Sequence, residues 1–187
     1  MARTKDPNLS RHIIERTIET SVEKGMAKAT SIEIAKGSGV TEATVFSHFG
    51  SIANLRKKAY LYAEDAFKTH FAKLASDCAD CDLQILCLRL LDASIELHKY
   101  AQYIYAYELL DSVTPNDYQC SQASKDVEYF KKAFASVSQQ KSDDEFLLWW
   151  QSKCVLLKYF ALRVRLGVDY SSANREKYVK IIFGDIL

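Results

Sequence analysis

The sequence predicts an all-α protein, and three observations lead to that fold class. Gly and Pro, which interrupt helices, are scarce: the 187 residues include six Gly and two Pro. Apolar residues recur at helical spacing along most of the chain. Hydrophobic residues make up 48% of the chain and charged residues 26%, which is enough to bury a substantial core. We expect about nine helices, with ends defined to within about two to four residues.

The N-terminal part should contain one long helix followed by two short ones. Residues 9–24 carry an apolar stripe at helical spacing, and Gly25 is the residue type that commonly follows the end of a helix. Thr30 and Thr41 are suited to cap the N-termini of two short helices, the second of which covers residues 42–48.

The remaining helices are longer. The pattern predicts them over residues 52–76, 83–98, 99–111, 118–137, 142–166 and from 172 to the C-terminus. Pro115 prevents the third of these from continuing into the fourth. Ser142 and Glu145 form a capping box, and Gly167 ends the helix that they start.

Residues 30–49 have the packing pattern of a helix-turn-helix. Ala35 lets a second helix cross closely, and Gly39, four residues later, can adopt the positive φ that a tight turn needs. Ile34, Val40 and Val45 supply the apolar wedge between the two short helices. This spacing of a small residue, a glycine and a β-branched residue is typical of a helix-turn-helix that reads DNA. The alternative is a short helical hairpin within a larger bundle.

The second short helix is small and polar on its outer side. The residues that could approach base edges and thymine methyl groups in a major groove are Glu42, Ala43, Thr44, Ser47 and His48. Thr30, Ser31 and Thr41 lie at helix N-termini, where free backbone N–H groups and the helix dipole favour a phosphate. The segment is therefore predicted to bind double-stranded DNA.

At these residues the chain resembles the TetR/AcrR family of transcriptional regulators. The resemblance covers residues 11–55 and rests on Gly25, Thr30, Ser31, Ile34, Ala35, Gly39, Val40, Thr41, Thr44, Val45, Phe46, His48, Phe49 and Leu55. It implies a homodimeric, mostly repressing protein with a DNA-binding domain at residues 1–51 and an effector-binding and dimerisation domain at residues 52–187. It also implies specific roles: Thr30 and Ser31 would contact backbone phosphates, Glu42, Ala43 and Thr44 would face bases, and Phe46 and His48 would flank a phosphate.

Two positions depart from the family's pattern. The family usually has Tyr where Phe46 stands, so a hydroxyl donor is missing, and it usually has Lys where Ile52 stands, so a cation is missing. Fewer phosphate contacts predict weaker binding and a shallower dependence on salt. The basic residues that could compensate are Arg3, Lys5, Arg11, Arg56, Lys57 and Lys58.

The C-terminal part is predicted to form the subunit interface. Residues 145–166 are apolar on nearly every face of the expected helix, so both sides of that helix must be covered. The protein's own core covers one side, and a second subunit, paired through this helix and the C-terminal one, would cover the other. An ordinary core helix is the alternative. Dimerisation would place two reading helices about 34 Å apart, the spacing of successive major grooves.

Aromatic residues in the same part are candidates for binding a small-molecule effector. Those singled out are Tyr103, Tyr107, Phe130, Trp149 and Trp150. Their stacking surfaces and polar tips would suit a flat or amphipathic effector, whereas ordinary core packing is the alternative. An effector would alter DNA binding through the helix over residues 52–76 by changing the separation of the two reading helices.

Charge is distributed unevenly along the chain. The net charge is +1, but residues 1–60 contain ten Lys and Arg against six Asp and Glu, whereas the rest contains fifteen against eighteen. A basic N-terminal part fits a segment that binds a polyanion, although an ordinary solvated surface could show the same surplus.

The cysteines and the N-terminus predict a cytoplasmic protein without a membrane partner. The five cysteines are an odd number without framework spacing, the first residues are polar, and no apolar run is long enough to span a membrane. Cys78 and Cys81 form a C-x-x-C pair, which leaves open a redox switch or a pair of surface thiols, because zinc would need a second pair. Cys87, Cys120 and Cys154 are expected to be buried.

No enzyme signature is found in the sequence. No His follows a Glu by three residues, and the nucleotide-binding, hydrolase and metalloprotease patterns are missing, so we expect no catalytic residue, cofactor or metal. The leading hypothesis is a homodimeric repressor that binds a palindromic operator and is released by a small-molecule effector. One alternative is a helical small-molecule-binding or catalytic bundle whose helix-turn-helix is only scaffold. Another is an activator or architectural DNA-binding protein without an effector.

Overall fold

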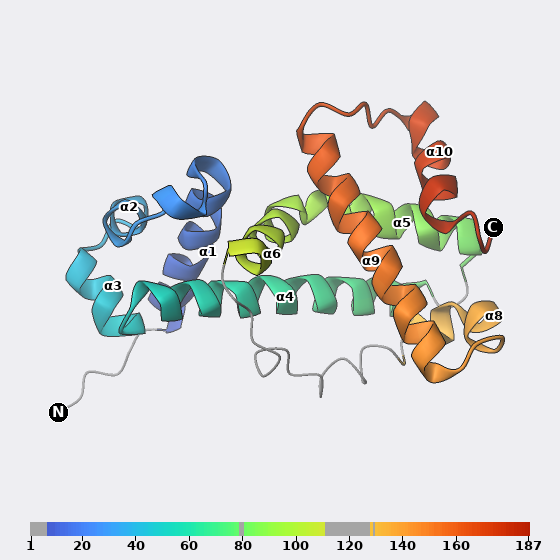
Figure 1. Ribbon diagram of the computed structural model, residues 1–187, viewed down its shortest axis with the longest axis horizontal. Coiled ribbons are helices and arrows are strands. Elements are labelled where there is room, and N and C mark those ends of the chain that lie inside the picture. Colours follow the sequence, from blue (N-terminus) through green and yellow to red (C-terminus); the bar gives the residue numbers. More distant parts are fainter. Residues whose placement is uncertain (1–6, 79–80, 111–127, 129) are drawn as a thin grey trace. The chain divides into compact units, whose positions relative to one another are not determined.

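The computed structural model describes residues 7–78, 81–110, 128 and 130–187, and every regular element in them is a helix (Figure 1). The predicted all-α class is confirmed. The chain divides into two compact units, of which the first comprises residues 1–66 and 102–112 and the second residues 67–101 and 113–187. The predicted functional boundary between residues 51 and 52 stays a prediction, because a compact unit need not coincide with one function.

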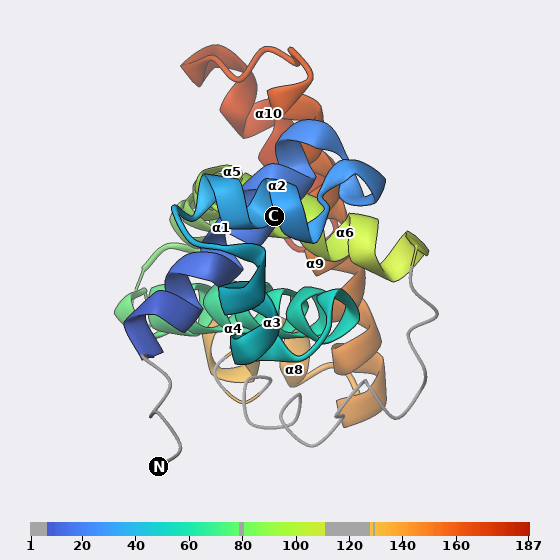
Figure 2. The same ribbon diagram turned by 90° about the vertical axis from the view of Figure 1, so that its left-hand side faces the viewer.

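The first unit is built from the N-terminal helices and parts of two later ones. Its elements are α1 (Pro7–Lys24), the 3-10 turn η1 (Met26–Lys28), α2 (Ser31–Gly37), α3 (Glu42–Phe49), the first part of α4 (Ile52–Asp77) and the last part of α6 (His98–Leu110). Figure 2 looks onto α1, α2 and α3. Helix α1 starts two residues before its predicted start at Leu9, because Pro7 suits the first helical position, where its missing N–H costs nothing. Gly25 follows the helix with φ 88°, as expected of a terminating glycine.

The second unit contains the rest of α4 and the start of α6, together with α5 (Leu83–Glu96), α8 (Ala135–Ser138), α9 (Asp143–Arg165) and α10 (Ser172–Phe183). Helices α9 and α10 both pack on α5 (Figure 1). These three helices carry apolar side chains that are fully or almost fully buried, among them Leu86, Leu90, Phe146, Leu157 and Phe183. Among the described residues, no helix is both long and apolar enough to cross a membrane.

Most predicted helices are confirmed, with two differences in the second unit. The break between the fifth and sixth helices falls at Leu97 rather than after residue 98. The helix predicted over residues 118–137 lies mostly outside the described residues, and its described end is interrupted at Phe134 (φ −110°, ψ 45°) before α8 begins. The capping box of Ser142 and Glu145 is present at the start of α9, and Gly167 follows α9 with φ 96°.

A charged side chain is buried between α9 and the C-terminal end of α10. Lys153 is 8% exposed, and its Nζ donates to the carbonyl oxygen of Ile182 at 2.8 Å and to Oδ1 of Asp185 at 2.6 Å. The same ammonium lies over the ring of Trp149, whose Nε1 donates to Oδ2 of Asp185 at 2.7 Å. These contacts attach the last residues of the chain to α9.

Candidate nucleic-acid interface

The two short helices are started by threonine caps, as the sequence predicts. Thr30 Oγ1 accepts from the backbone N–H of Glu33 at 3.3 Å, and Thr41 Oγ1 accepts from that of Thr44 at 3.2 Å. Both threonines have extended backbone angles, which is the conformation of a helix N-cap. Each cap satisfies one of the free N–H groups at its helix start and leaves others exposed at the same end.

The turn between α2 and α3 has the conformation expected for a helix-turn-helix. Gly39 has φ 66°, and the amide of Val40 donates to the carbonyl of Ala35 at 3.0 Å, which closes the end of α2. The predicted wedge forms: Ile34 and Val45 are 0% and 1% exposed, and Val40 packs against the same cluster. Two helices of seven and eight residues are thus held together by a turn that needs one glycine.

A buried core fixes these helices to α1 and α4. It consists of Ile13, Ile34, Ala35, Val45, Phe49 and Leu55. Ile52, which stands where the family usually has Lys, is partly buried against this core. Its side chain therefore contributes packing at the start of α4 instead of a cation.

The outer side of α3 carries small and polar side chains at the surface. Ala43, Phe46 and Ser47 are exposed, and Thr44 is partly exposed. Thr41 and Thr44 hydroxyls lie 2.9 Å apart, and Ser47 Oγ donates to the carbonyl of Thr44 at 2.9 Å. The hydroxyl groups are therefore ordered by neighbours one turn away.

The structure adds two side-chain contacts that sequence reasoning missed. Ser31 Oγ in α2 donates to a carboxylate oxygen of Glu42 at the start of α3, so a predicted phosphate contact and a predicted base contact are bonded to each other. Ser10 Oγ in α1 lies 2.9 Å from Nδ1 of His48. Ser10 and His48 are 38 residues apart in the sequence, so no local pattern could have predicted their contact. The DNA-binding roles of all these residues remain predictions.

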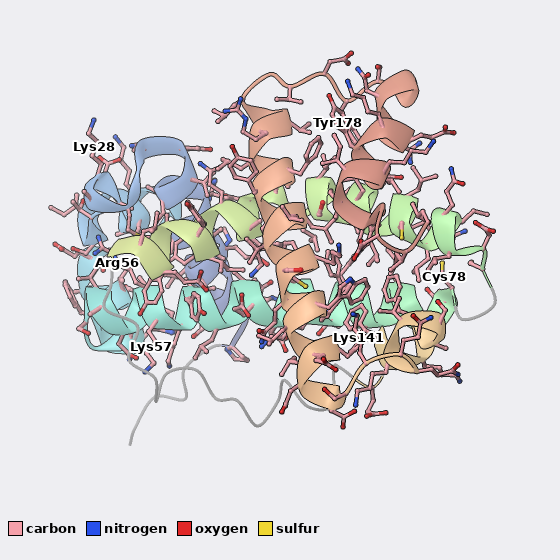
Figure 3. All side chains as sticks on the ribbon, turned by 45° about the vertical axis from the view of Figure 1, so that its right-hand side comes forward. Lys28, Arg56, Lys57, Cys78, Lys141 and Tyr178 are labelled. Atoms are coloured by element: carbon pink, nitrogen blue, oxygen red, sulfur yellow. The ribbon has the colours of Figure 1, made fainter. Side chains whose placement is uncertain are left out.

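The basic residues around the helices have mixed environments. Lys24 in α1 pairs with Glu33 in α2, and its hydrogen bond holds the pKa of the Glu33 carboxyl below its ordinary value. Lys58 lies over the ring of Phe49 at 5.6 Å and is exposed. Arg56, predicted as a possible phosphate contact, instead directs its guanidinium to backbone carbonyls of the connection between α1 and α2 (Figure 3).

Residues 13–59, which include the whole helix-turn-helix, match the family described as "Bacterial regulatory proteins, tetR family". The segment that carries the helix-turn-helix is thus of the tetR type. The resemblance noted in the sequence is confirmed, and the fold and this domain are those of a DNA-binding transcriptional regulator. Regulators of the tetR family are typically not enzymes. No curated protein matches the chain.

Solved structures, two of them described as TetR-type regulators, have a similar fold along most of their length. A regulator from Mesorhizobium loti MAFF303099 is 15% identical with a TM-score of 0.72, and the alignment covers 98% of this chain and 96% of that one. A TetR-like regulator from Rhodococcus sp. RHA1 is 14% identical with a TM-score of 0.63, covering 98% of each chain. The multidrug-binding protein EbrR, solved with imidazole, is 16% identical with a TM-score of 0.57, covering 95% of this chain and 96% of that one.

The five predicted effector-binding residues fall into two groups. In the first unit Tyr103 is fully buried, and Tyr107 stacks on Tyr60 with ring centres 4.8 Å apart. In the second unit Phe130 stacks on Trp150 at 3.9 Å. Trp149 makes an edge contact with Phe134 at 5.4 Å, so it lies in the same aromatic group as Trp150. Their part in binding an effector stays a prediction.

The cysteines differ in their surroundings. Cys78 is 2% exposed, and its Sγ accepts from Arg89 at 3.0 Å, so the interpretation as two surface thiols is wrong for this residue (Figure 3). Cys81 is partly exposed. Cys87 is fully buried as predicted, Cys154 is only partly buried, and Cys120 lies outside the described residues.

Proposed function

We propose that the protein is a homodimeric transcriptional repressor that binds a palindromic operator and is released from it by a small-molecule effector. The observation that carries the proposal is the outer side of α3, where small and hydroxyl side chains are exposed on a helix anchored by the core of the first unit. A helix of this kind enters a major groove, because its short side chains let the backbone approach the bases.

Individual residues of α2 and α3 have distinct proposed roles. Thr30, Ser31 and Thr41 contact backbone phosphates at the helix starts. The residues that face bases are Glu42, Ala43, Thr44 and Ser47, while Phe46 and His48 lie beside a phosphate. Phe46 is 41% exposed but has no hydroxyl group, so it offers DNA only its ring.

The proposed subunit interface is an exposed apolar stripe on α9. Leu148, Val155 and Tyr159 are 67%, 65% and 56% exposed and recur at intervals of seven and four residues, which places them on one side of the helix. On the other side Phe146, Trp150 and Leu157 are buried in the second unit. Ile181 on α10 is also 63% exposed. Two copies that pair through α9 and α10 would cover these side chains in a four-helix interface with two-fold symmetry.

A flat or amphipathic small molecule is the proposed effector. The aromatic residues of the second unit, Phe130, Trp149 and Trp150, offer stacking surfaces for it. A protein with this fold, EbrR, is a multidrug-binding protein. Because the proposed target is operator DNA, we propose that the protein acts in the cytoplasm.

The DNA-binding proposal is tested by gel mobility shift with the DNA upstream of the protein's own gene. We expect sequence-selective retardation that is lost at about 0.5 M salt, because phosphate contacts release counterions. T44E should abolish binding, since it places a carboxylate against the bases and phosphates. T69E is the matched control, because Thr69 is exposed on α4 in the second unit and the charge change is the same. Salt-insensitive or unselective retardation of the wild type would contradict the proposal, and binding by T44E would remove Thr44 from the reading surface.

The effector proposal is tested by a thermal-shift screen of aromatic compounds. A compound present at about 100 times its dissociation constant should stabilise the fold by about 2.7 kcal/mol. The same compound should release the retarded DNA. A compound that stabilises the protein without releasing DNA would argue against induction by that ligand.

A further inference from the structure

Arg56 connects three elements of the first unit. Its NH2 group donates to the carbonyl oxygen of Met26 at 2.9 Å and to that of Ala29 at 3.4 Å, and its own carbonyl oxygen accepts from Tyr103 Oη at 3.1 Å. The side chain is partly buried, and its Nε has no partner among the described residues. The guanidinium therefore points into the unit.

The carbonyls that Arg56 holds belong to the connection that leads into α2. This connection covers residues 25–30, and its internal backbone bonds run from Lys28 and Ala29 to Gly25 and from Thr30 to Lys28. Those bonds shape the turn but do not attach it to another helix. The bonds from Arg56 do attach it to α4, directly before Thr30, the N-cap of α2. Since α2 and α3 share one core, the place where α2 starts also determines where α3 lies.

Helix α6 supports Arg56 from the other side. Tyr103 is fully buried, and its hydroxyl group donates to the carbonyl oxygen of Arg56, so this buried donor is satisfied by the backbone of α4. One turn further along each helix, the hydroxyl group of Tyr60 donates to Glu108 at 3.2 Å, and the Tyr60 ring stacks on Tyr107. These contacts fix α4 to α6 at the level of Arg56.

We propose that Arg56 is a positioning residue for DNA binding: it holds the connection between α1 and α2 against α4, and Tyr103 holds the backbone of Arg56 in place. The inference rests on the proposed DNA-binding function and adds to it a residue that touches no DNA. Both bonds come from one nitrogen, NH2, which lies one bond farther along its side chain than the ammonium of Lys, so a Lys at this position would not reach both carbonyl oxygens in the same geometry.

The test compares R56M, R56K and Y103F with the wild-type protein by operator titration at several salt concentrations. We expect R56M to bind about tenfold more weakly or worse, because the two bonds to the carbonyl oxygens of Met26 and Ala29 are lost and the start of α2 is loosened. R56K should resemble R56M, although it keeps the charge. Y103F should also weaken binding, without any change of charge. The R56M and Y103F effects should be less than additive in the double variant, because both act through the same residue.

The salt dependence separates positioning from direct phosphate contact. If Arg56 only positions α2, the slope of log K against log salt stays the same in R56M. If Arg56 neutralises a phosphate, the slope falls by about 0.9 and R56K binds like the wild type, which would overturn the inference. Titrations are made well below the melting temperature of each variant, so a loss of stability alone leaves the measured affinity unchanged.

Other outcomes are equally decisive. Wild-type affinity in R56M or in Y103F would overturn the inference while leaving the DNA-binding proposal intact. If R56M does not fold, the operator affinity of Y103F alone tests the inference. A wild-type protein that binds no DNA selectively would end the proposed function itself, which is a different result from a variant that binds normally.

Discussion

The buried ammonium of Lys153 leads to a quantitative prediction for K153M. Met keeps the length and packing of the aliphatic stem but removes the donors to Ile182 and Asp185. Hydrogen bonds to charged groups contribute about 1.5–3 kcal/mol each. The Asp185 side chain is 47% exposed and keeps the bond from Trp149, so water can hydrate its charge after the substitution. We therefore expect a loss of about 2–3 kcal/mol, which is less than the sum of about 3–6 kcal/mol for two such bonds and less than the cost of an isolated buried charge.

The assay is thermal unfolding of both proteins at one protein concentration. For a chain of this size, each kcal/mol lowers Tm by about 2–4 °C, so K153M should melt about 4–12 °C below the wild type. A double-mutant cycle with D185N isolates the pair, and the double variant should lose less than the sum of the single losses. A K153M protein that melts within a degree of the wild type, or a cycle that is additive, would refute the stabilising role of Lys153.

The same pair gives the sign of a pH effect. Burial alone would raise the pKa of the Asp185 carboxyl, but the hydrogen bonds from Lys153 and Trp149 outweigh burial and hold the pKa below its ordinary value. A carboxyl with a lowered pKa contributes stability above its unfolded pKa of about 3.9, and that stability is lost as the pH falls through the folded value. The wild type should therefore lose stability more steeply than K153M as the pH is lowered below about 4.

Three further predictions concern other parts of the chain. G39A should lower the unfolding free energy by about 1–2 kcal/mol in chemical denaturation and weaken operator binding, because Ala must adopt φ 66° at the turn. V155E together with Y159E should convert a dimer to a monomer in sedimentation experiments and weaken DNA binding, since both side chains lie in the proposed interface; a variant that stays dimeric would place the interface elsewhere. Burial raises the pKa of the Cys87 thiol to about 12, so Cys87 should resist alkylation at pH 8 until the protein unfolds, as mass spectrometry of labelled peptides would show.

Much of the first unit could be predicted because its signals are local. A threonine cap acts on an amide three residues later, and the small residue, the glycine and the β-branched residue of the helix-turn-helix lie within eleven residues. The capping box of Ser142 and Glu145 is equally local. Such features follow from the sequence whatever the rest of the chain does.

The missed features join residues that are distant in the sequence. Ser10 meets His48, Arg56 meets Ala29, and Lys153 meets Asp185 only after the helices have packed. A sequence pattern shows which residues are polar, but it does not show which polar groups will face each other. No Gly or Pro lies at the interruption at Phe134, so the sequence pattern predicted one continuous helix there.

The arrangement of charges has a consequence for how the proposed DNA affinity would arise. Phe46 lacks a hydroxyl, Ile52 packs in the core, Arg56 serves backbone carbonyls, and Lys24 is paired with Glu33. Fewer cations then remain to neutralise phosphates than the surplus of basic residues suggests, so counterion release can supply only part of the binding free energy. Neutral donors must supply more, namely hydroxyl groups and backbone N–H groups at helix starts. Such short-range contacts require accurate placement, because a hydrogen bond weakens steeply with small errors in distance and angle. The proposed role of Arg56 meets that requirement, because its bonds to the carbonyl oxygens of Met26 and Ala29 hold the start of α2 in place. The internal hydrogen bonds of the first unit would then contribute to DNA affinity without contacting the DNA.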